Sequence, residues 1–392
     1  SEGCVLHFRE GNNTLGIHWK GGQYYWWDSN LVVPADEWSY VAITVSPTEI
    51  KLFVNESQHS WDLTTTAFDL TEINIGTYYG WRSRNFNGLI EEATFWKKTL
   101  TDQDVKLARH LTKNDVSDTD LIAYYQFNHN SGGSIYDKKG TSDLVIYGGA
   151  TLVSSDAPVG PGTSSILNVN SSGISDFTNA ECEMTFASTG TYPNGEVVVS
   201  KINMNPSALP NANVIDNTYW VVNNYGTNSS FTALSDINFS NITNVETLST
   251  SNLQLFKRSG NADSSNSWEN SIGSAIDINA ANHAAKFTNL GILNSLSQFY
   301  IGSNTALSIE NMDVDDFKIY PNPVNQSENL YFHNLKGDAK FSMFDMRGKQ
   351  LFKTTINQQG RVKMPLLSKG IYLYNVETTN RIQNGKLIVK SK

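Results

Sequence analysis

The sequence predicts an all-β protein that is divided into several domains. The chain has 392 residues, which exceeds the usual size of a single domain. Hydrophobic residues make up 39% of it, enough for ordinary cores, whereas charged residues make up only 17%. Asn, Ser, Thr, Gly and aromatic residues are abundant, which favours short strands joined by many turns.

Strand patterns fill the first predicted domain, residues 1–157. Residues 38–45 alternate and are rich in β-branched and aromatic side chains, and a Ser-Pro-Thr turn separates them from a second strand at 50–54. The dipeptide Asn87-Gly88 predicts a turn before a strand at 89–96. This part of the chain is therefore expected to be a β domain.

A single helix is expected in this domain. Thr101 fits an N-cap, with Asp104 at the third helical position, and an apolar stripe runs from Val105 to Leu111. Strands resume at residues 121–127.

A second domain is predicted over residues 158–310. It begins in a segment rich in Pro, Gly and Ser, residues 157–165, which is typical of a linker. Its clearest strands are 219–222, 253–257 and 298–302, and loops rich in Asn and Ser separate them. This spacing suits a β-sandwich.

The charge of the chain changes sign near residue 317. Residues 318–392 contain 10 Lys and 3 Arg against 2 Asp and 2 Glu, a net charge of +9; the whole chain carries −9, so residues 1–317 carry −18. The acidic balance of the larger part argues against nucleic acid as a partner. The change of sign predicts a linker at 311–317 and a separate domain at 318–392.

The last domain has the pattern of a small sandwich. Residues 339–346 and 349–356 are expected to form a hairpin around Arg347-Gly348. Further strands are expected at 371–376 and 386–390.

Four motifs follow one another in this last domain. They are Tyr320-Pro-Asn-Pro-Val324, Met343-Phe-Asp-Met-Arg-Gly-Lys349, Leu367-Ser-Lys-Gly-Ile-Tyr-Leu373 and Gly385-Lys-Leu-Ile-Val-Lys390. In order, spacing and position, residues 318–392 resemble the type A C-terminal sorting domain, a small Ig-like sandwich, of cargo of the type IX secretion system of Bacteroidetes. The residues that carry the sorting signal are then Tyr320, Pro321, Asn322, Pro323, Asp345, Arg347, Gly348, Gly370, Tyr372, Gly385, Lys386 and Lys390.

This resemblance implies a route of export. A Sec-type leader would bring the chain to the periplasm, and the outer-membrane translocon and its shuttle protein would then read the folded tail. A sortase would remove the tail and release the cargo or attach it to a surface glycolipid. The expected location is therefore secreted or on the outer cell surface. No run of 18 apolar residues predicts a membrane span, and the start at Ser1 is that expected of a mature or trimmed chain.

The first domain resembles the laminin-G/concanavalin-like jelly-roll family over about residues 1–112. The segments that carry the resemblance are Glu37-Trp-Ser-Tyr-Val-Ala-Ile-Thr44, Lys51-Leu-Phe-Val-Asn55, Phe86-Asn-Gly-Leu-Ile-Glu-Glu-Ala-Thr-Phe-Trp96 and Leu100-Thr-Asp-Gln-Asp104. Ile90-Glu91-Glu92 stands where the family usually has Ile-Asp-Glu. The resemblance implies a jelly roll; abbreviated early strands suggest that Ser1 is a cut end of a longer polypeptide.

Catalytic patterns are absent from the sequence. There is no G-x-S-x-G, P-loop or H-E-x-x-H, and the seven histidines have no ligand spacing. Glu91 and Glu92 are adjacent in a predicted strand, so they would face opposite sides and could not share a substrate. We therefore expect no enzyme and assign no catalytic residue.

Metal binding is weakly indicated. Asp115, Asp118 and Asp120 could supply carboxylates to Ca²⁺, but the run lacks the glycine and final glutamate of an EF-hand, so we interpret it as a solvated loop. Jelly-roll proteins often carry a calcium ion, so the resemblance makes Ca²⁺ a possible cofactor while assigning no ligand here.

Two aromatic runs, 24–28 and 78–84, suggest a surface for sugars. Aromatic rings stack on sugar faces, and arginine donates to hydroxyls, although the same residues would also suit a sandwich core. The candidate ligand-binding residues are Trp26, Trp27, Trp81, Arg82 and Arg84.

Residues 1–317 are thus expected to be the passenger of an exported protein. Our main hypothesis is a binding module or adhesin for polysaccharide or a surface, with a role in attachment or gliding motility. Two alternatives stay open: an accessory region of a secreted hydrolase whose catalytic domain lies upstream, and a structural spacer.

Overall fold

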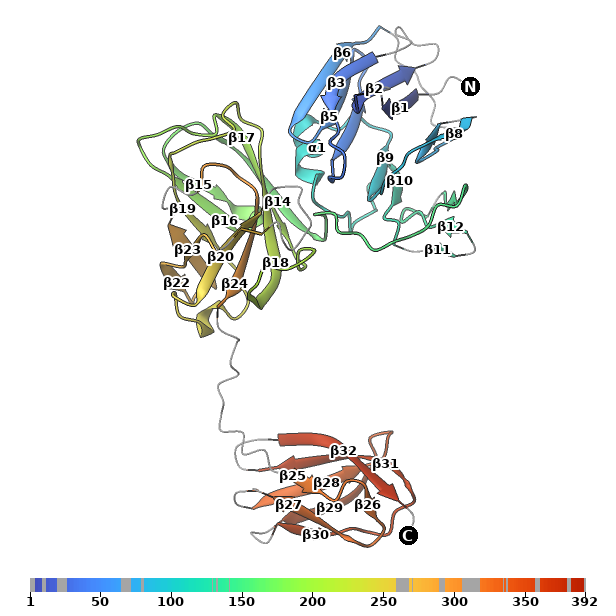
Figure 1. Cartoon of the computed structure of the whole chain (residues 1–392), viewed down its shortest axis with the longest axis vertical. Coiled ribbons are helices and arrows are strands. Elements are labelled where there is room, and N and C mark those ends of the chain that lie inside the picture. The colour runs from blue at the N-terminus through green and yellow to red at the C-terminus, as the bar shows by residue number, and fades with distance from the viewer. Residues whose placement is uncertain are drawn as a thin grey trace. The chain divides into compact units, whose positions relative to one another are not determined.

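The protein forms two compact units, Ser1–Leu307 and Ser308–Lys392, in the computed structural model of Figure 1. Strands dominate both units, as the sequence predicts. The structure describes residues 4–8, 12–19, 27–64, 72–78, 81–128, 130–131, 133–140, 142–258, 268–269, 271–288, 293–304, 318–333, 335, 338–356, 360–378 and 382–390. The predicted linker at 311–317 lies outside these ranges.

Several small antiparallel sheets make up the first part of unit 1. Their orders are β1-β2-β3, β4-β5-β6, β7-β8, β10-β9 and β11-β12-β13. The strands are β1 (Cys4–Phe8), β2 (Thr14–Trp19), β3 (Trp27–Val32), β4 (Val41–Val45), β5 (Glu49–Val54), β6 (Ser57–Asp62), β7 (Thr77–Tyr78), β8 (Trp81–Asn85), β9 (Ala93–Trp96), β10 (Leu121–Tyr125), β11 (Asn130–Ser131), β12 (Ser134–Ile135) and β13 (Leu144–Val145).

The strands predicted at 38–45 and 50–54 are confirmed as β4 and β5. β5 is the central strand of its sheet, and Ile50, Leu52 and Val54 are buried, so its alternation reflects one core-facing side. The strand predicted at 89–96 is shorter, because β9 begins at Ala93. Glu92 has a φ of 52°, a left-handed conformation that ends extended pairing.

The helix α1 (Asp102–Ala108) follows the prediction. Thr101 and Asp104 form a capping box: the Thr101 side chain accepts from the Asp104 amide, and the Asp104 carboxylate accepts from the Thr101 amide. The helix ends before Leu111, which instead forms a bridge with Gly160.

Two larger sheets make up the second part of unit 1. The first has the order β14-β17-β18-β24-β20-β21 and the second β15-β16-β19-β23-β22. Figure 1 shows them as two stacked layers, as expected for a sandwich. The strands are β14 (Gly162–Val169), β15 (Gly173–Phe177), β16 (Cys182–Phe186), β17 (Gly195–Ile202), β18 (Asn213–Asn224), β19 (Leu234–Phe239), β20 (Leu253–Arg258), β21 (Gly273–Ser274), β22 (Asp277–Asn279), β23 (Ala284–Thr288) and β24 (Gln298–Ser303). Short 3-10 turns lie at Thr178–Ala180 and Val245–Thr247.

The three strands predicted in this region are neighbours in one sheet, as parts of β18, β24 and β20. One face packs into the main core around Trp220 and Phe299. The other face is covered by a second apolar cluster that includes Tyr219, Phe256 and Tyr300. Burial on both faces explains why these strands are almost continuously apolar.

The segment expected to be a linker, 157–165, is fixed in place, so that interpretation is wrong. The Gly160 amide donates to the carbonyl of His110 at 3.1 Å, and the Thr112 amide donates to the carbonyl of Gly160 at 2.9 Å. Strand β14 then begins at Gly162. The domain boundary predicted between residues 157 and 158 therefore falls inside a single compact unit.

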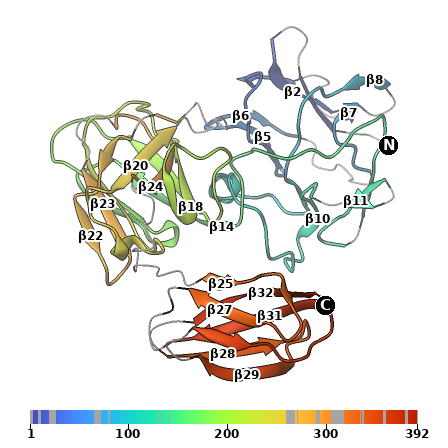
Figure 2. The ribbon, with the colours of Figure 1, turned by 60° about the horizontal axis from the view of Figure 1, so that its bottom comes forward.

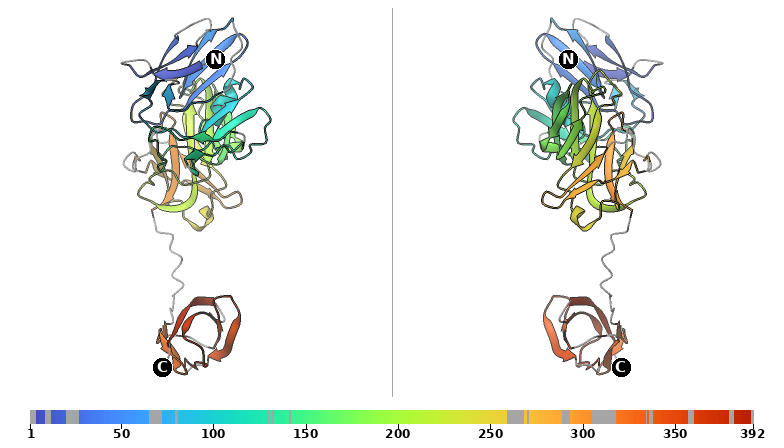
Figure 3. Two further views of the ribbon diagram at one scale, coloured as in Figure 1. Left: turned by 90° about the vertical axis from the view of Figure 1, so that its right-hand side faces the viewer. Right: turned by 90° about the vertical axis from the view of Figure 1, so that its left-hand side faces the viewer.

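Unit 2 is a small sandwich with one three-stranded sheet, β25-β27-β30, and one five-stranded sheet, β26-β32-β31-β28-β29. Figure 3 shows the unit end-on, with the strands enclosing the core. Buried residues such as Phe341, Val376 and Leu387 fill that core. The strands are β25 (Lys318–Tyr320), β26 (Val324–Asn325), β27 (Asn329–His333), β28 (Ala339–Phe344), β29 (Gln350–Ile356), β30 (Arg361–Lys363), β31 (Gly370–Glu377) and β32 (Ile382–Lys390). The four strands predicted here are confirmed as β28, β29, β31 and β32.

Candidate functional site

Asn322 joins the predicted sorting motif to the last strand of the chain. Its side-chain Nδ2 donates to the carbonyl of Lys386 at 2.8 Å, and its Oδ1 accepts from the amide of Ile388 at 3.0 Å. The peptide bonds that precede Pro321 and Pro323 are both cis. Because neither proline carries a backbone N–H, the side-chain amide of Asn322 makes the hydrogen bonds that a strand backbone would make.

The residues on either side of Pro-Asn-Pro are also fixed. Tyr320 is 47% exposed, and its ring stacks on that of Tyr331 with the ring centroids 5.6 Å apart. Val324 is buried and pairs in parallel with Val389, and the next pair brings in Lys390. The motif thus runs from β25 of the three-stranded sheet, which ends at Tyr320, to β26 at the edge of the five-stranded sheet. It brings Tyr320, Asn322, Lys386 and Lys390 of the predicted signal into one part of the unit.

The hairpin motif is organised by Asp345. Its Oδ1 accepts from the amides of Arg347 and Lys349, each at 2.9 Å. Gly348 has a φ of 83°, which a residue with a side chain adopts only under strain. Asp345 and Gly348 therefore shape the turn, and the Arg347 side chain is exposed.

Three further sorting residues shape strands β31 and β32. The hydroxyl of Tyr372 donates to the carbonyl of Ser368 at 2.8 Å, and Gly370 pairs with Val389 at the start of β31. Gly385 lies beneath the ring of Tyr374: a Cβ at that position would be 2.3 Å from the phenolic oxygen. The need for glycine at 385 thus follows from a cross-strand aromatic ring, which the sequence alone does not reveal.

The candidate sugar-binding residues of unit 1 have different fates. Trp27 is only 3% exposed and packs against Trp61 in the core, so its assignment as a ligand contact is wrong. Trp26 lies outside the described residues. Trp81 and Arg82 belong to strand β8, but their side chains also lie outside the described part. Arg84 is exposed near the end of the same strand.

An aromatic pair that the sequence did not single out lies beside this strand. Phe8 and Phe86 are 40% and 41% exposed, and their rings stack with centroids 5.7 Å apart. Phe86 follows Arg84 by two positions and lies directly after the end of β8 at Asn85. The place of Phe86 directly before the Asn87-Gly88 turn could have marked it in the sequence as an exposed aromatic residue. Its pairing with Phe8 could not be read from the sequence.

The acidic loop at 115–120 is tied to lysines. Lys98 pairs with the Asp118 carboxylate at 3.0 Å, and the Lys139 ammonium donates to the carbonyls of Val116 and Asp118 at 2.7 and 2.8 Å. The Asp115 carboxylate accepts from the Ser117 amide. Lysine ammonium groups thus contact the Asp118 carboxylate and two backbone carbonyls of this loop, while the Asp115 carboxylate bonds to the loop's own backbone. Among the described residues, no three His, Cys, Asp or Glu side chains are grouped to hold a metal.

Glu91 and Glu92 precede strand β9 and do not lie within it, which corrects the geometry used in the sequence argument. The Tyr124 hydroxyl donates to Glu92, while Gln126 and the Lys113 amide donate to the Tyr124 oxygen at 2.8 and 3.0 Å. Burial outweighs these contacts and raises the pKa of Glu92 to about 7. The network links β10 to the segments on either side of the helix, which is a structural role.

Two regions of the chain match known families. Residues 318–390 match the secretion system C-terminal sorting domain, and residues 1–106 match the concanavalin A-like lectin/glucanases superfamily. No curated protein matches the chain. Within the described ranges, no helix is long and apolar enough to cross a membrane.

One solved structure with detectable similarity is that of PorZ, described as an essential bacterial surface component of the type-IX secretion system of Porphyromonas gingivalis. The match covers 100% of this chain and 58% of that one, at 10% identity and a TM-score of 0.18. A score this low carries no argument about fold or function.

The sorting domain indicates export through the type IX secretion system, to the cell surface or into the medium. The geometry above explains the domain's own motifs, since Asn322, Asp345 and Gly385 each fix a defined part of its sandwich. The chain is therefore a type IX secretion cargo that carries a concanavalin A-like domain at residues 1–106 and a C-terminal sorting domain at residues 318–390.

Proposed function

We propose that the passenger, residues 1–317, is a binding module that attaches to polysaccharide outside the cell. The observation that carries this proposal is the exposed Phe8–Phe86 pair, with the exposed Arg84 two residues before Phe86 in the chain, within the region that matches the lectin superfamily. Stacked rings offer an apolar face to a sugar ring, and a guanidinium donates to hydroxyls around it.

The proposed role is adhesion and involves no reaction. Export to the surface or the medium supplies the setting, since a bound polysaccharide would then lie on another cell or on a solid surface. Attachment and gliding motility are the cellular processes that such an adhesin would serve.

The test uses the full chain on an array of bacterial and plant polysaccharides, followed by affinity electrophoresis on any polysaccharide that binds. Phe86→Ala should weaken binding about tenfold, since a stacked aromatic contributes roughly 0.5–1.5 kcal/mol beyond its buried area. Arg84→Ala should weaken it as well. Tyr147→Ala is the matched control, because Tyr147 is a 76% exposed aromatic residue in the same unit.

Three results would count against the proposal. Absence of binding across the array would favour a structural spacer. Release of reducing sugar from a bound polysaccharide would show an enzyme. Equal loss of binding in Tyr147→Ala would show that Phe86 has no specific role.

A further inference from the structure

The outward face of the five-stranded sheet in unit 2 is unusually apolar. Tyr372 and Leu387 point into the core, so the alternate residues Ile371, Leu373 and Ile388 point outward. Ile371 and Ile388 lie directly opposite each other on β31 and β32 and are 50% and 41% exposed. The solvent face of an antiparallel sheet is normally polar, so an apolar centre on this face needs a reason.

The apolar side chains continue across the sheet. Leu373 is opposite Phe344 on β28, and Leu351 on β29, 38% exposed, continues the row. Figure 2 shows β32, β31, β28 and β29 side by side. We call this row of five residues, Ile388, Ile371, Leu373, Phe344 and Leu351, the apolar stripe.

Lysines surround the stripe. Lys386 and Lys390 point outward from β32 on either side of Ile388, and Lys353 does so from β29. Lys369 precedes β31 and is also exposed. Among the described residues of unit 2, Lys340 and Glu377 form an ion pair at 3.7 Å, and these four lysines form none with another described residue.

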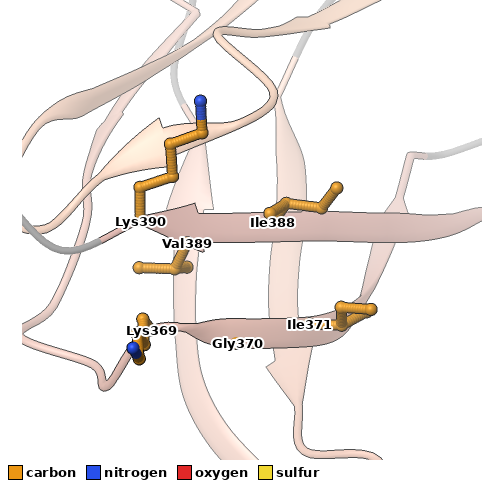
Figure 4. A pocket seen from close by; sticks show the side chains of 6 residues that line it. All are labelled: Lys369, Gly370, Ile371, Ile388, Val389 and Lys390. Atoms are coloured by element: carbon orange, nitrogen blue, oxygen red, sulfur yellow. The ribbon is translucent and has the colours of Figure 1, made fainter.

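A shallow hollow lies at one end of the stripe (Figure 4). Ile371 and Ile388 line it on neighbouring strands, and Lys369 and Lys390 flank it at the strand ends. An apolar floor with positive charge at its margin suits an apolar side chain set among carboxylates.

We propose that this face is the surface by which the export machinery reads the domain, through a protein patch with an apolar centre and an acidic rim. The inference rests on the sorting role of the domain. Charge complementarity selects an acidic patch, since residues 318–392 carry a net charge of +9. The apolar centre favours a protein partner over a charged lipid surface, because fully desolvated apolar residues supply most of the affinity in protein interfaces.

The residues of the family motifs fall into two groups, those that stabilise the sandwich and those that lie on its surface. Asn322, Asp345 and Gly385 hold the sandwich together, as described above, while Ile371, Ile388 and Lys390 stand on its surface within those same motifs. A reader that docks on this face would therefore depend on both groups of residues, the first through the fold and the second by contact.

The test measures export of the full chain in its native host as the ratio of external to periplasmic protein. Ile371→Ser with Ile388→Ser, and separately Lys369→Glu with Lys386→Glu and Lys390→Glu, should each lower this ratio about tenfold, the effect of losing central contacts or reversing a complementary rim. Leu366→Ser, at an 80% exposed site, is the apolar control. Arg361→Glu with Lys363→Glu, on the other sheet, is the charge control. All variants must melt at the wild-type temperature.

A photoreactive residue at position 371 of the full chain should crosslink to a component of the type IX machinery, and one at position 363 should not. Wild-type export of both face variants would overturn the proposal. So would a face that binds vesicles of phosphatidylcholine and phosphatidylglycerol and crosslinks only to lipid. A chain that ends at residue 317 tests the sorting role of the domain separately from the role of this face. If that chain stays in the periplasm while the face variants are exported, the domain is the export signal but this face is not the surface that the machinery contacts.

Discussion

Residues 158–161 of unit 1 and 321–323 of unit 2 are both short segments that begin and end with proline. They are held in place by different kinds of hydrogen-bonding group. In unit 1 the backbone of Gly160 donates to His110 and accepts from Thr112, at 3.1 and 2.9 Å. In unit 2 the side chain of Asn322 donates to Lys386 and accepts from Ile388, at 2.8 and 3.0 Å. An asparagine amide thus does in one unit what a peptide group does in the other.

The two segments differ most in burial. Pro158 and Gly160 are buried, whereas Asn322 and Pro323 are exposed. A buried group that loses its partner stays without one, but an exposed group turns to water. Two hydrogen bonds in each place should therefore contribute very different amounts to stability.

Among the variants that test this comparison, His110→Ala should lower the free energy of unfolding most. The ring is 3% exposed, and its Nδ1 lies 2.7 Å from the carbonyl oxygen of Pro158, to which it must donate. Removing it leaves a buried carbonyl unpaired and a cavity, which should lower the free energy of unfolding by about 2–4 kcal/mol. All nine tryptophans lie in residues 1–317, so urea unfolding followed by tryptophan fluorescence reports on unit 1 alone.

His110→Gln is the matched control, because its amide can still donate to Pro158 and it should recover part of the loss. If His110→Ala unfolds at the wild-type urea concentration, the first segment is not anchored through this ring.

Acid should destabilise unit 1 through the same residue. Burial, together with the charge of Arg109, lowers the pKa of His110 from 6.5 to about 3. The unfolded chain therefore binds a proton below pH 6.5 that the folded chain refuses, so this contribution to stability is complete above pH 6.5 and is lost as the pH falls. The slope is at most about 1.4 kcal/mol per pH unit.

Glu92 opposes this trend. Its pKa is raised from 4.5 to about 7, so between these values the folded chain keeps a proton that the unfolded chain releases, and stability falls as the pH rises. The free energy of unfolding, measured with urea between pH 4.5 and 6.5, should then change with pH in opposite directions in two single variants. His110→Gln should lose stability with rising pH, and Glu92→Gln should gain it. Parallel slopes in both variants would contradict the assignment.

The contrast between the two segments also shows what the sequence could predict. Alternation identified β4, and short runs rich in aliphatic and aromatic residues identified β18, β20 and β24, because the burial of each strand is recorded in its own residues. The capping box at Thr101 and Asp104 was equally local. The composition of 157–165 predicted a linker. Whether such a segment is free depends on its hydrogen bonds to His110 and Thr112, which lie far from it in the sequence and belong to no motif.

The candidate site was predictable to a similar degree. The sorting residues could be named from their motifs, although the partners of Asn322 and Gly385 across the sheet could not. Trp27 was misjudged because an aromatic residue on a strand has the same pattern whether its ring faces the core or the solvent. Phe8 was missed because it belongs to a strand remote in sequence from Phe86.

Gly160→Ala should weaken the first segment to a smaller extent. A Cβ there would lie 2.5 Å from the sulfur of Met204 and 2.8 Å from Cγ2 of Ile202. Met204 can move, since it is 43% exposed, but Ile202 is fully buried, so the cost should be about 1–2 kcal/mol. Gly273→Ala, where a Cβ would meet nothing within 4 Å, is the control and should change stability little. Equal effects at the two sites would show that the Gly160 contact is not tight.

Asn322→Ala should have the smallest effect on stability, about 1 kcal/mol, because the groups it leaves behind are exposed to water. Its effect should be local: hydrogen exchange at the Ile388 amide should accelerate, while the Gly160 and Thr112 amides keep their protection. Asn322→Asp sharpens the result, since its carboxylate can still accept from Ile388 but cannot donate to the Lys386 carbonyl. If both variants exchange at the wild-type rate, the pairing of β26 with β32 joins the motif to the last strand without help from Asn322, and its side chain does not replace a strand backbone.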